Sequence, residues 1–137
     1  MKPEAAEFLR KAQMFLPKAD GMLALWPEEA GRAAYFAAFH AAQAPIFERR
    51  GSAAKTHAGV QTEFARLARK EARIEADLRG FLGRPYNLKA AADYETGASA
   101  SVSPERAASA VQMARRFVSC IAGLLEGGSN DDTDQGD

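Results

Sequence analysis

Hydrophobic positions along the chain recur every three or four residues, which is the period of an amphipathic helix. The first such stretch runs from about residue 3 to residue 25, and Pro17 and Gly21 predict a kink or a break in it. No segment shows the alternation of a strand bounded by hairpin signals. The pattern therefore predicts an all-α protein.

Local signals predict where the next helices begin and end. Residues 26–29, Trp-Pro-Glu-Glu, begin a second helix, because proline suits the first turn and carboxylates suit the positive end of the helix dipole. Residues 49–51, Arg-Arg-Gly, end it, and Pro45 predicts a bend inside it. Thr56 caps a shorter third helix that runs through Arg69, and a fourth spans about residues 75–94.

The last predicted helix starts at residues 103–105, where Ser, Pro and Glu supply a cap, a first-turn proline and an acid in order. Gly127 and Gly128 mark its end. The expected fold is an up-and-down helical bundle of four long helices plus one short helix, formed by a single domain over residues 1–126. Residues 127–137 hold four aspartates and no cation, which predicts a disordered acidic tail.

The second predicted helix has the most informative pattern, because no charged side chain occurs from residue 33 to residue 47. A helix without a charged face is expected to be buried nearly all round. Large apolar and polar side chains share one arc of it: Tyr35, Phe36, Phe39, Ile46 and Phe47, with Arg32, His40 and Gln43. Unpaired burial costs roughly 1–3 kcal/mol for each polar group, so this arc is the first place to look for function.

Composition and charge narrow the class of protein. The chain has 137 residues, of which 47% are hydrophobic, and its 18 basic and 18 acidic residues cancel. Without the tail the body has 18 basic and 14 acidic residues, and an excess of four positive charges permits weak contact with nucleic acid. No apolar run approaches the roughly 20 residues that span a bilayer, and no signal-peptide pattern is present, so we expect a cytoplasmic protein without a membrane contact.

Few residues offer chemistry. Cys120 is the single cysteine, which excludes an internal disulfide, and its apolar neighbours predict a packed thiol. His40 is either a core histidine bonded to a neighbouring helix or a site residue. His57 follows Lys55 and Thr56 at a predicted helix start, where free N–H groups attract anions, although a simple cap and loop explains it equally well. Two histidines without a carboxylate at ligand spacing predict no metal site.

A second polar cluster falls on the predicted fourth helix. Lys89 and Asp93 lie four residues apart on one face, and Tyr94 is adjacent. Lysine before aspartate is the weaker orientation for a helix pair, so helix stabilisation explains the pair poorly, and a structural polar cluster is the alternative. We expect one polar pocket in which six side chains converge: Arg32, His40, Lys55, His57, Lys89 and Asp93.

Three segments in this order resemble the HEPN domain family, whose name stands for higher eukaryotes and prokaryotes nucleotide-binding. They are residues 32–42, residues 55–60, and Ala-Asp-Tyr at 92–94 followed by residues 102–105. The resemblance covers roughly residues 5–125 and is to the small stand-alone bacterial branch. It implies an all-α bundle that commonly dimerises and is often encoded beside a minimal nucleotidyltransferase, as a toxin and its antitoxin.

The resemblance also implies a metal-independent ribonuclease without a cofactor, acting through an Arg-x(4–6)-His motif. Arg50 and His57, with six residues between them, match this spacing, and Lys89 stands where relatives often have arginine. Lys89, Asp93 and Tyr94 would then contact RNA or a nucleotide.

In such an enzyme a histidine takes the 2′-hydroxyl proton or protonates the leaving oxygen, and a cation holds the phosphate. His57 or His40 is the base, and Arg32, Arg50 or Lys55 is the anion clamp. The alternative is a non-catalytic helical module that binds a nucleotide or the nucleotidyltransferase partner through the same residues.

Overall fold

The computed structural model describes the backbone of residues 1–82 and 103–136, and the side chains of residues 1–82 and 103–127. Within these ranges all regular secondary structure is helical, which confirms the all-α prediction. The helices are α1 (Pro3–Met22), α2 (Pro27–Arg50), α3 (His57–Arg69), α4 (Ala76–Arg79) and α6 (Pro104–Gly136). No helix in the described part of the chain is both long enough and apolar enough to cross a bilayer.

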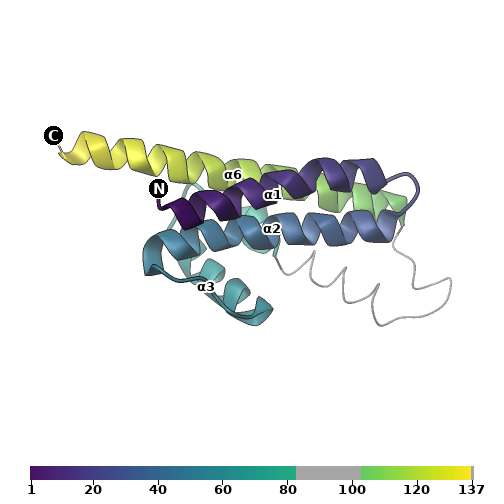
Figure 1. Ribbon diagram of the computed structural model, residues 1–137, viewed down its shortest axis with the longest axis horizontal. Helices are drawn as coiled ribbons and strands as arrows, with labels where there is room; N and C mark the ends of the chain where they lie inside the picture. The colour runs from purple at the N-terminus through teal and green to yellow at the C-terminus, as the bar shows by residue number, and fades with distance from the viewer. Residues whose placement is uncertain (83–102, 137) are drawn as a thin grey trace.

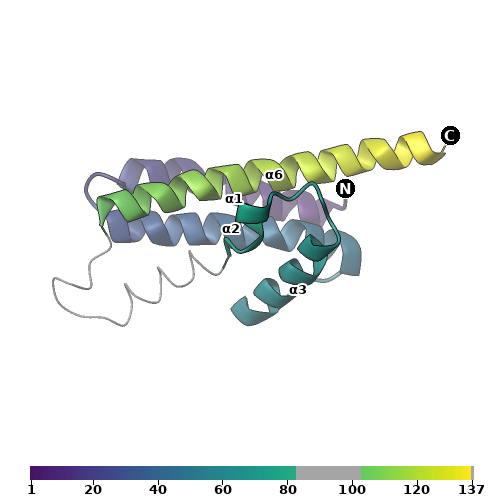
Figure 2. The ribbon, with the colours of Figure 1, turned by 180° about the vertical axis from the view of Figure 1, so that it is seen from behind.

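Three long helices form the body of the molecule. α1 and α2 are antiparallel and joined by a short turn, and α6 packs against both while running in the same direction as α2 (Figure 1). α3 packs against α2 near its C-terminal end, and α4 packs against α6 (Figure 2). The start of α3 lies beside the middle of α2, where His57 contacts Tyr35, and the later part of α3 lies beside the C-terminal end of α2.

The predicted helix ends are largely confirmed by local hydrogen bonds. Thr56 caps α3, because its Oγ1 accepts a bond of 2.9 Å from the backbone N–H of Gly59. Ser103 caps α6 in the same way, through a bond of 3.1 Å from the N–H of Arg106. α2 ends at Gly51, whose φ of 75° lies in the left-handed region that favours glycine and whose N–H donates to the carbonyl of Phe47.

The span 33–47 of α2 is largely buried, as its lack of charge predicts, but the aromatic arc is not its core face. The residues that line the interior are mostly alanines: Ala30, Ala33, Ala34, Ala37, Ala38, Ala41, Ala42 and Ala44. Small side chains let α1 and α6 approach α2 closely, so the large rings are left at the edge of the contact. Phe36, Phe39 and Phe47 are accordingly half-buried, whereas Tyr35 is only 1% exposed.

Three predicted boundaries are wrong. α1 ends at Met22, directly after Gly21, rather than at residue 25. The fourth helix starts where predicted but α4 stops at Arg79, because the chain turns at Gly80 and the Arg79 guanidinium bonds back to the carbonyls of Ile74 and Glu71. α6 continues past Gly127 to Gly136, since glycine in a helix costs only about 1 kcal/mol. The rest of the predicted fourth helix, including Lys89, Asp93 and Tyr94, lies outside the described residues.

Candidate functional site

The loop between α2 and α3 is fixed by a buried glutamine. Gln43 is 4% exposed, and its side-chain amide donates to the carbonyl of Ala54 at 2.9 Å while its Oε1 accepts from the Ala54 N–H at 3.0 Å. Both polar ends of the side chain are therefore satisfied inside the protein. The pair of bonds ties the middle of α2 to the residues that precede α3, and this fixes where α3 begins.

His57 is the first residue of α3 and its side chain is exposed. Its Nδ1 is hydrogen-bonded to the hydroxyl of Tyr35, a buried residue of α2, and the centroids of the two rings are 5.3 Å apart. A histidine whose Nδ1 is held by a hydrogen bond has a fixed ring orientation, so the direction in which its Nε2 points is fixed as well. The fold thus supplies one imidazole that is both accessible and oriented.

His40 lies on the same side of the molecule but in a different setting. Its ring stacks on Phe15 of α1 with centroids 5.5 Å apart and 5° between the planes, and on Phe8 with centroids 6.3 Å apart. Its Nδ1 is buried and has no hydrogen-bond partner among the described residues. Burial lowers the pKa of His40 from its ordinary value of 6.5, and the positive charge of Lys11 lowers it further. His40 is therefore a neutral imidazole at neutral pH.

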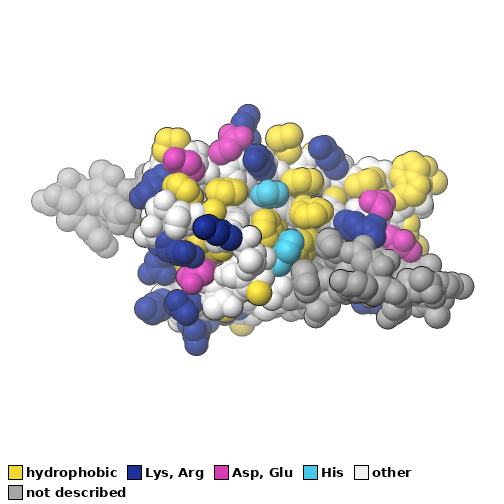
Figure 3. Space-filling view, turned by 60° about the horizontal axis from the view of Figure 1, so that its bottom comes forward, with side chains coloured by type: hydrophobic (Ala, Val, Ile, Leu, Met, Phe, Trp, Pro, Cys, Tyr) yellow, Lys and Arg dark blue, Asp and Glu magenta, His cyan; other side chains and the backbone are white. Residues whose placement is uncertain are grey.

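One phenyl ring connects the two histidines. The Phe39 ring centroid lies 5.5 Å from that of His40 and 4.9 Å from that of His57. We call the half-exposed surface around them the aromatic–histidine face, formed by Phe8, Phe15, Phe36, Phe39, His40 and His57. Figure 3 shows both histidines on one face of the molecule, surrounded by hydrophobic side chains, with lysines and arginines gathered at one end.

The candidate anion-binding side chains come from three different parts of the structure. Lys55 is exposed in the loop directly before His57, at the start of α3. Arg32 forms an ion pair with Glu29 one turn earlier on α2, and its side chain is 26% exposed. Arg50 lies at the C-terminal end of α2, where its Nη1 is 3.9 Å from Oε1 of Glu63 on α3. The predicted Arg50–His57 pair thus combines an oriented histidine with an arginine that faces a carboxylate.

Sequence reasoning missed two residues of this arrangement. Tyr35 and Phe39 were recognised only as large apolar positions of α2, yet Tyr35 holds His57 and Phe39 contacts both imidazoles. Their spacing of four residues places them on one face of the helix, beside His40. Nothing in the local sequence indicates that His57 of another helix packs there.

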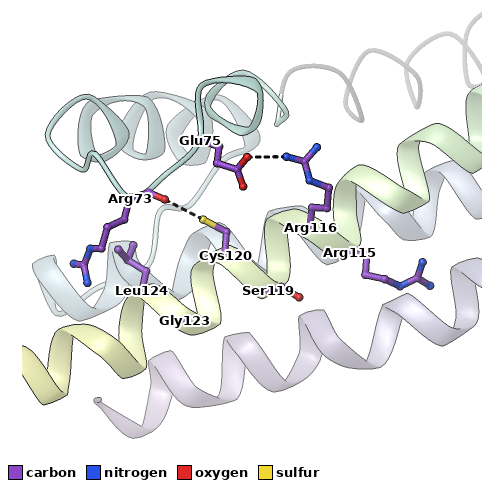
Figure 4. A pocket seen from close by; sticks show the side chains of 8 residues that line it. All are labelled: Arg73, Glu75, Arg115, Arg116, Ser119, Cys120, Gly123 and Leu124. Carbon is purple, nitrogen blue, oxygen red and sulfur yellow. Dashed lines mark hydrogen bonds and ion pairs between the residues drawn. The ribbon is translucent and has the colours of Figure 1, made fainter.

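A hollow of about 550 Å³ lies away from the histidines, between α6 and residues 73–75 (Figure 4). Its arginines are held by carboxylates: Arg116 bonds Asp77 at 2.8 Å and Glu75 at 3.1 Å, and Arg73 bonds Glu71 at 2.7 Å. The Arg73 guanidinium holds the pKa of Glu71 below its usual range, and the Asp77 carboxylate raises the pKa of Arg116. The two Arg116 bonds fasten Glu75, just before α4, and Asp77, within α4, to α6.

Cys120 lines the same hollow and has the packed environment that its neighbours predict. Its Sγ lies 3.8 Å from the carbonyl oxygen of Arg73, to which the thiol donates (Figure 4). Burial raises the pKa of the thiol, so it stays protonated at neutral pH. A protonated, half-buried thiol is a poor nucleophile, and we assign this residue to packing rather than to chemistry.

Within the residues whose side chains are described, no three histidines, cysteines or carboxylates stand close enough to hold a metal ion.

Comparison with known proteins identifies the family. A search among curated proteins found no similar sequence. The family model of the HEPN domain matches residues 5–124, which cover both histidines, most of α1, the whole of α2, α3 and α4, and α6 as far as Leu124. The chain therefore belongs to the HEPN domain family.

Proposed function

We propose that this protein is a metal-independent ribonuclease that works in the cytoplasm as one half of a toxin–antitoxin pair, with a minimal nucleotidyltransferase as its partner. Membership of the HEPN family, which often contains ribonucleases and toxins, supports the proposal. The observation that carries it is the exposed His57 imidazole, which is held through its Nδ1 by the buried Tyr35 hydroxyl.

The proposed reaction uses this oriented histidine as a general base. Nε2 of His57 accepts the proton of a ribose 2′-hydroxyl, and the resulting oxyanion attacks the adjacent phosphorus. The bond from phosphorus to the 5′-oxygen of the next nucleotide breaks, which leaves a 2′,3′-cyclic phosphate and a 5′-hydroxyl. Lys55 is the cation next to His57 in sequence and would stabilise the negative charge on the phosphate.

The other candidates have supporting parts in the proposal. His40, neutral because of its lowered pKa, is the second base, whereas it is poorly suited to donate a proton at neutral pH. Arg50 and Arg32 would bind phosphate after exchanging their carboxylate partners for the substrate, at low cost because both ion pairs are near the surface. Lys89, Asp93 and Tyr94 are proposed as further contacts to RNA.

The first prediction concerns His57 and its orientation by Tyr35. His57→Ala should reduce the rate of RNA cleavage by about 10²–10⁴-fold, the usual contribution of a general base. Tyr35→Phe keeps the ring and removes the hydroxyl, so it should reduce the rate by up to about tenfold, because one hydrogen bond contributes about 0.5–1.5 kcal/mol. Cleavage is measured on single-stranded RNA with 5 mM EDTA, roughly enough to remove divalent ions from a solvent-exposed site.

The controls separate chemistry from folding. Both variants should keep the helical circular dichroism of the wild type, since His57 is exposed and Tyr35→Phe preserves packing. Loss of cleavage in EDTA, or products that carry a 3′-hydroxyl, would contradict the mechanism. Equal cleavage by the wild type and by His40→Ala/His57→Ala would show that the activity belongs to a contaminant.

The half-exposed rings favour one other function, that of a non-catalytic binding module. Phe15, Phe36 and Phe39 present aromatic surface next to His40, and such rings stack on bases or pack against a partner protein. In that case Phe39→Ala would weaken binding of a nucleotide or of the nucleotidyltransferase, while His57→Ala would leave binding unchanged and no cleavage would be found in either protein.

A further inference from the structure

The positive charge of the body is concentrated in one short stretch of sequence. Residues 48–73 contain seven lysines and arginines against three glutamates, an excess of four. The rest of residues 1–126 is balanced, with eleven basic and eleven acidic residues. The whole positive excess of the body therefore comes from the C-terminal end of α2, from α3 and from the residues just after α3.

The fold brings these cations onto one surface, which we call the basic ridge: Arg49, Arg50, Arg66, Lys70 and Arg73. All five side chains are exposed. Figure 3 shows lysines and arginines gathered at the end of the molecule next to the two histidines. The ridge starts at the end of α2, follows the last turns of α3 and reaches the loop before α4.

The carboxylates near the ridge are already engaged. Oε1 of Glu63 lies 3.9 Å from Arg50 and 3.4 Å from Arg66, so one carboxylate serves two guanidinium groups. The carboxylate of Glu48 accepts two bonds of 2.9 Å from the backbone N–H of Lys2.

Two cations of the ridge have no such neighbour. Among the described side chains, no carboxylate lies within 4 Å of a charged nitrogen of Arg49 or Lys70. Neither cation is held in an ion pair by these side chains, although the charge of Arg49 acts on the nearby Glu71, and both cations flank the same groove.

The ridge borders a groove of about 380 Å³ between α2, the end of α3 and α6. Its apolar lining is formed by Pro45, Leu67, Leu124 and Leu125, and its polar lining by three cations and two carboxylates, Arg49, Lys70, Arg73, Glu48 and Glu71. Glu48 is bonded to the backbone N–H of Lys2 and Glu71 to the Arg73 guanidinium. The remaining cations and the apolar lining are complementary to a nucleotide, whose base is flat and apolar and whose phosphate is an anion.

We infer that the basic ridge binds the phosphate backbone of single-stranded RNA, with a base in the groove, and that the same strand reaches the His57 site. α3 has 13 residues and so is about 20 Å long, with His57 at its first residue and Lys70 directly after its last. A ligand that contacts both ends is an oligonucleotide rather than a mononucleotide. The inference rests on the proposed function only for the identity of the ligand as RNA. Binding of RNA to the basic ridge can be tested without measuring cleavage.

The test measures how the affinity for a single-stranded RNA oligonucleotide depends on salt. Arg49→Gln/Lys70→Gln should lower the slope of log Kd against log salt by about 1.4, because each phosphate contact on a single strand contributes about 0.7. The matched control, Arg10→Gln/Arg106→Gln, removes the same charge from exposed positions of α1 and α6. The control slope should equal that of the wild type.

Three further measurements distinguish RNA binding by the basic ridge from cleavage, from a net-charge effect and from binding of any polyanion. His57→Ala should bind RNA with an unchanged slope, so loss of cleavage with retained binding would leave the inference intact even if the proposed chemistry failed. Equal slope changes in the ridge variant and the control variant would overturn it, because net charge alone would then explain binding. Equal affinity of the wild type for polyaspartate of the same length would also overturn it, since the surface would not distinguish RNA from an acidic peptide.

Discussion

At the scale of single residues, the two histidines differ because their neighbours differ. His57 has a hydroxyl at Nδ1, whereas Nδ1 of His40 is buried between α1 and α2 and has no partner among the described residues. Burial disfavours the imidazolium form of His40, so its folded-state pKa is below the 6.5 of an exposed histidine. The same residue type therefore has two different environments within 6 Å of one phenyl ring.

A pH dependence of stability follows for His40. Between its lowered folded-state pKa and 6.5 the unfolded chain binds more protons than the folded one, so stability increases with pH in that window. The free energy of unfolding of the wild type should therefore fall, relative to that of His40→Phe, as the pH decreases below about 6.5, the unperturbed value. Urea unfolding of both proteins from pH 7.5 to 5 measures the difference. A difference that does not change with pH, or that grows in favour of the wild type at low pH, would contradict the burial argument.

At the scale of elements, the position of α3 depends on one side chain of α2. Gln43→Ala would strand the buried N–H and carbonyl of Ala54, which should lower the free energy of unfolding by roughly 1–3 kcal/mol. Hydrogen exchange at the start of α3 should also become faster, because the loop that precedes it loses its attachment. Gln13→Ala, an exposed glutamine of α1, is the matched control and should change stability by less than about 0.5 kcal/mol. Similar effects of the two substitutions would show that the bonds to Ala54 do not hold the loop.

The helices differ in how well local sequence predicts them. Caps at Thr56 and Ser103 and the glycine at position 51 act within a few residues, so the start of α3, the start of α6 and the end of α2 follow from the sequence. The span after residue 75 was predicted as one long helix because its apolar residues keep a helical period. α4 is instead four residues long and buries Leu78, whereas Phe81 and Leu82 are buried by the turn that follows it. The spacing of apolar residues alone does not distinguish one long helix from a short helix followed by a turn.

At the scale of the whole molecule, the aromatic–histidine face leaves several half-buried rings at the surface of a small domain, and HEPN domains commonly dimerise. We predict a homodimer in which the Arg32 and His40 regions of both chains face one cleft. Sedimentation at micromolar concentration should give twice the 14.7 kDa of one chain. Phe36→Asp, on this face, should produce a monomer, because a charge would be buried in the interface.

Leu25→Asp is the control for this prediction. Leu25 is 73% exposed, but it lies in the turn between α1 and α2 rather than on the aromatic–histidine face, so its substitution should leave the dimer intact. A wild-type protein that sediments only as a monomer would contradict the prediction. Dissociation by Leu25→Asp and not by Phe36→Asp would place the interface at the turn instead.

The candidate site was only partly predictable. The sequence indicates His57 at a helix start and His40 on an uncharged helix, because both properties depend on neighbours within a few residues. It also places a positive excess in residues 48–73. It does not indicate that Tyr35 is the partner of His57, since 22 residues separate them and only the packing of α3 on α2 brings the two rings together.

The sequence by itself determined the helical class, most helix ends and the charge of each segment, because helix period, capping and charge are properties of neighbouring residues. Tertiary structure alone decided which face of α2 became the core. Alanines allowed α1 and α6 to approach, and the aromatic rings that the pattern placed inside were left around the two histidines. It also decided that Arg49, Lys70 and Arg73 border one groove with Leu124 of α6, because contacts between distant segments depend on how the helices pack.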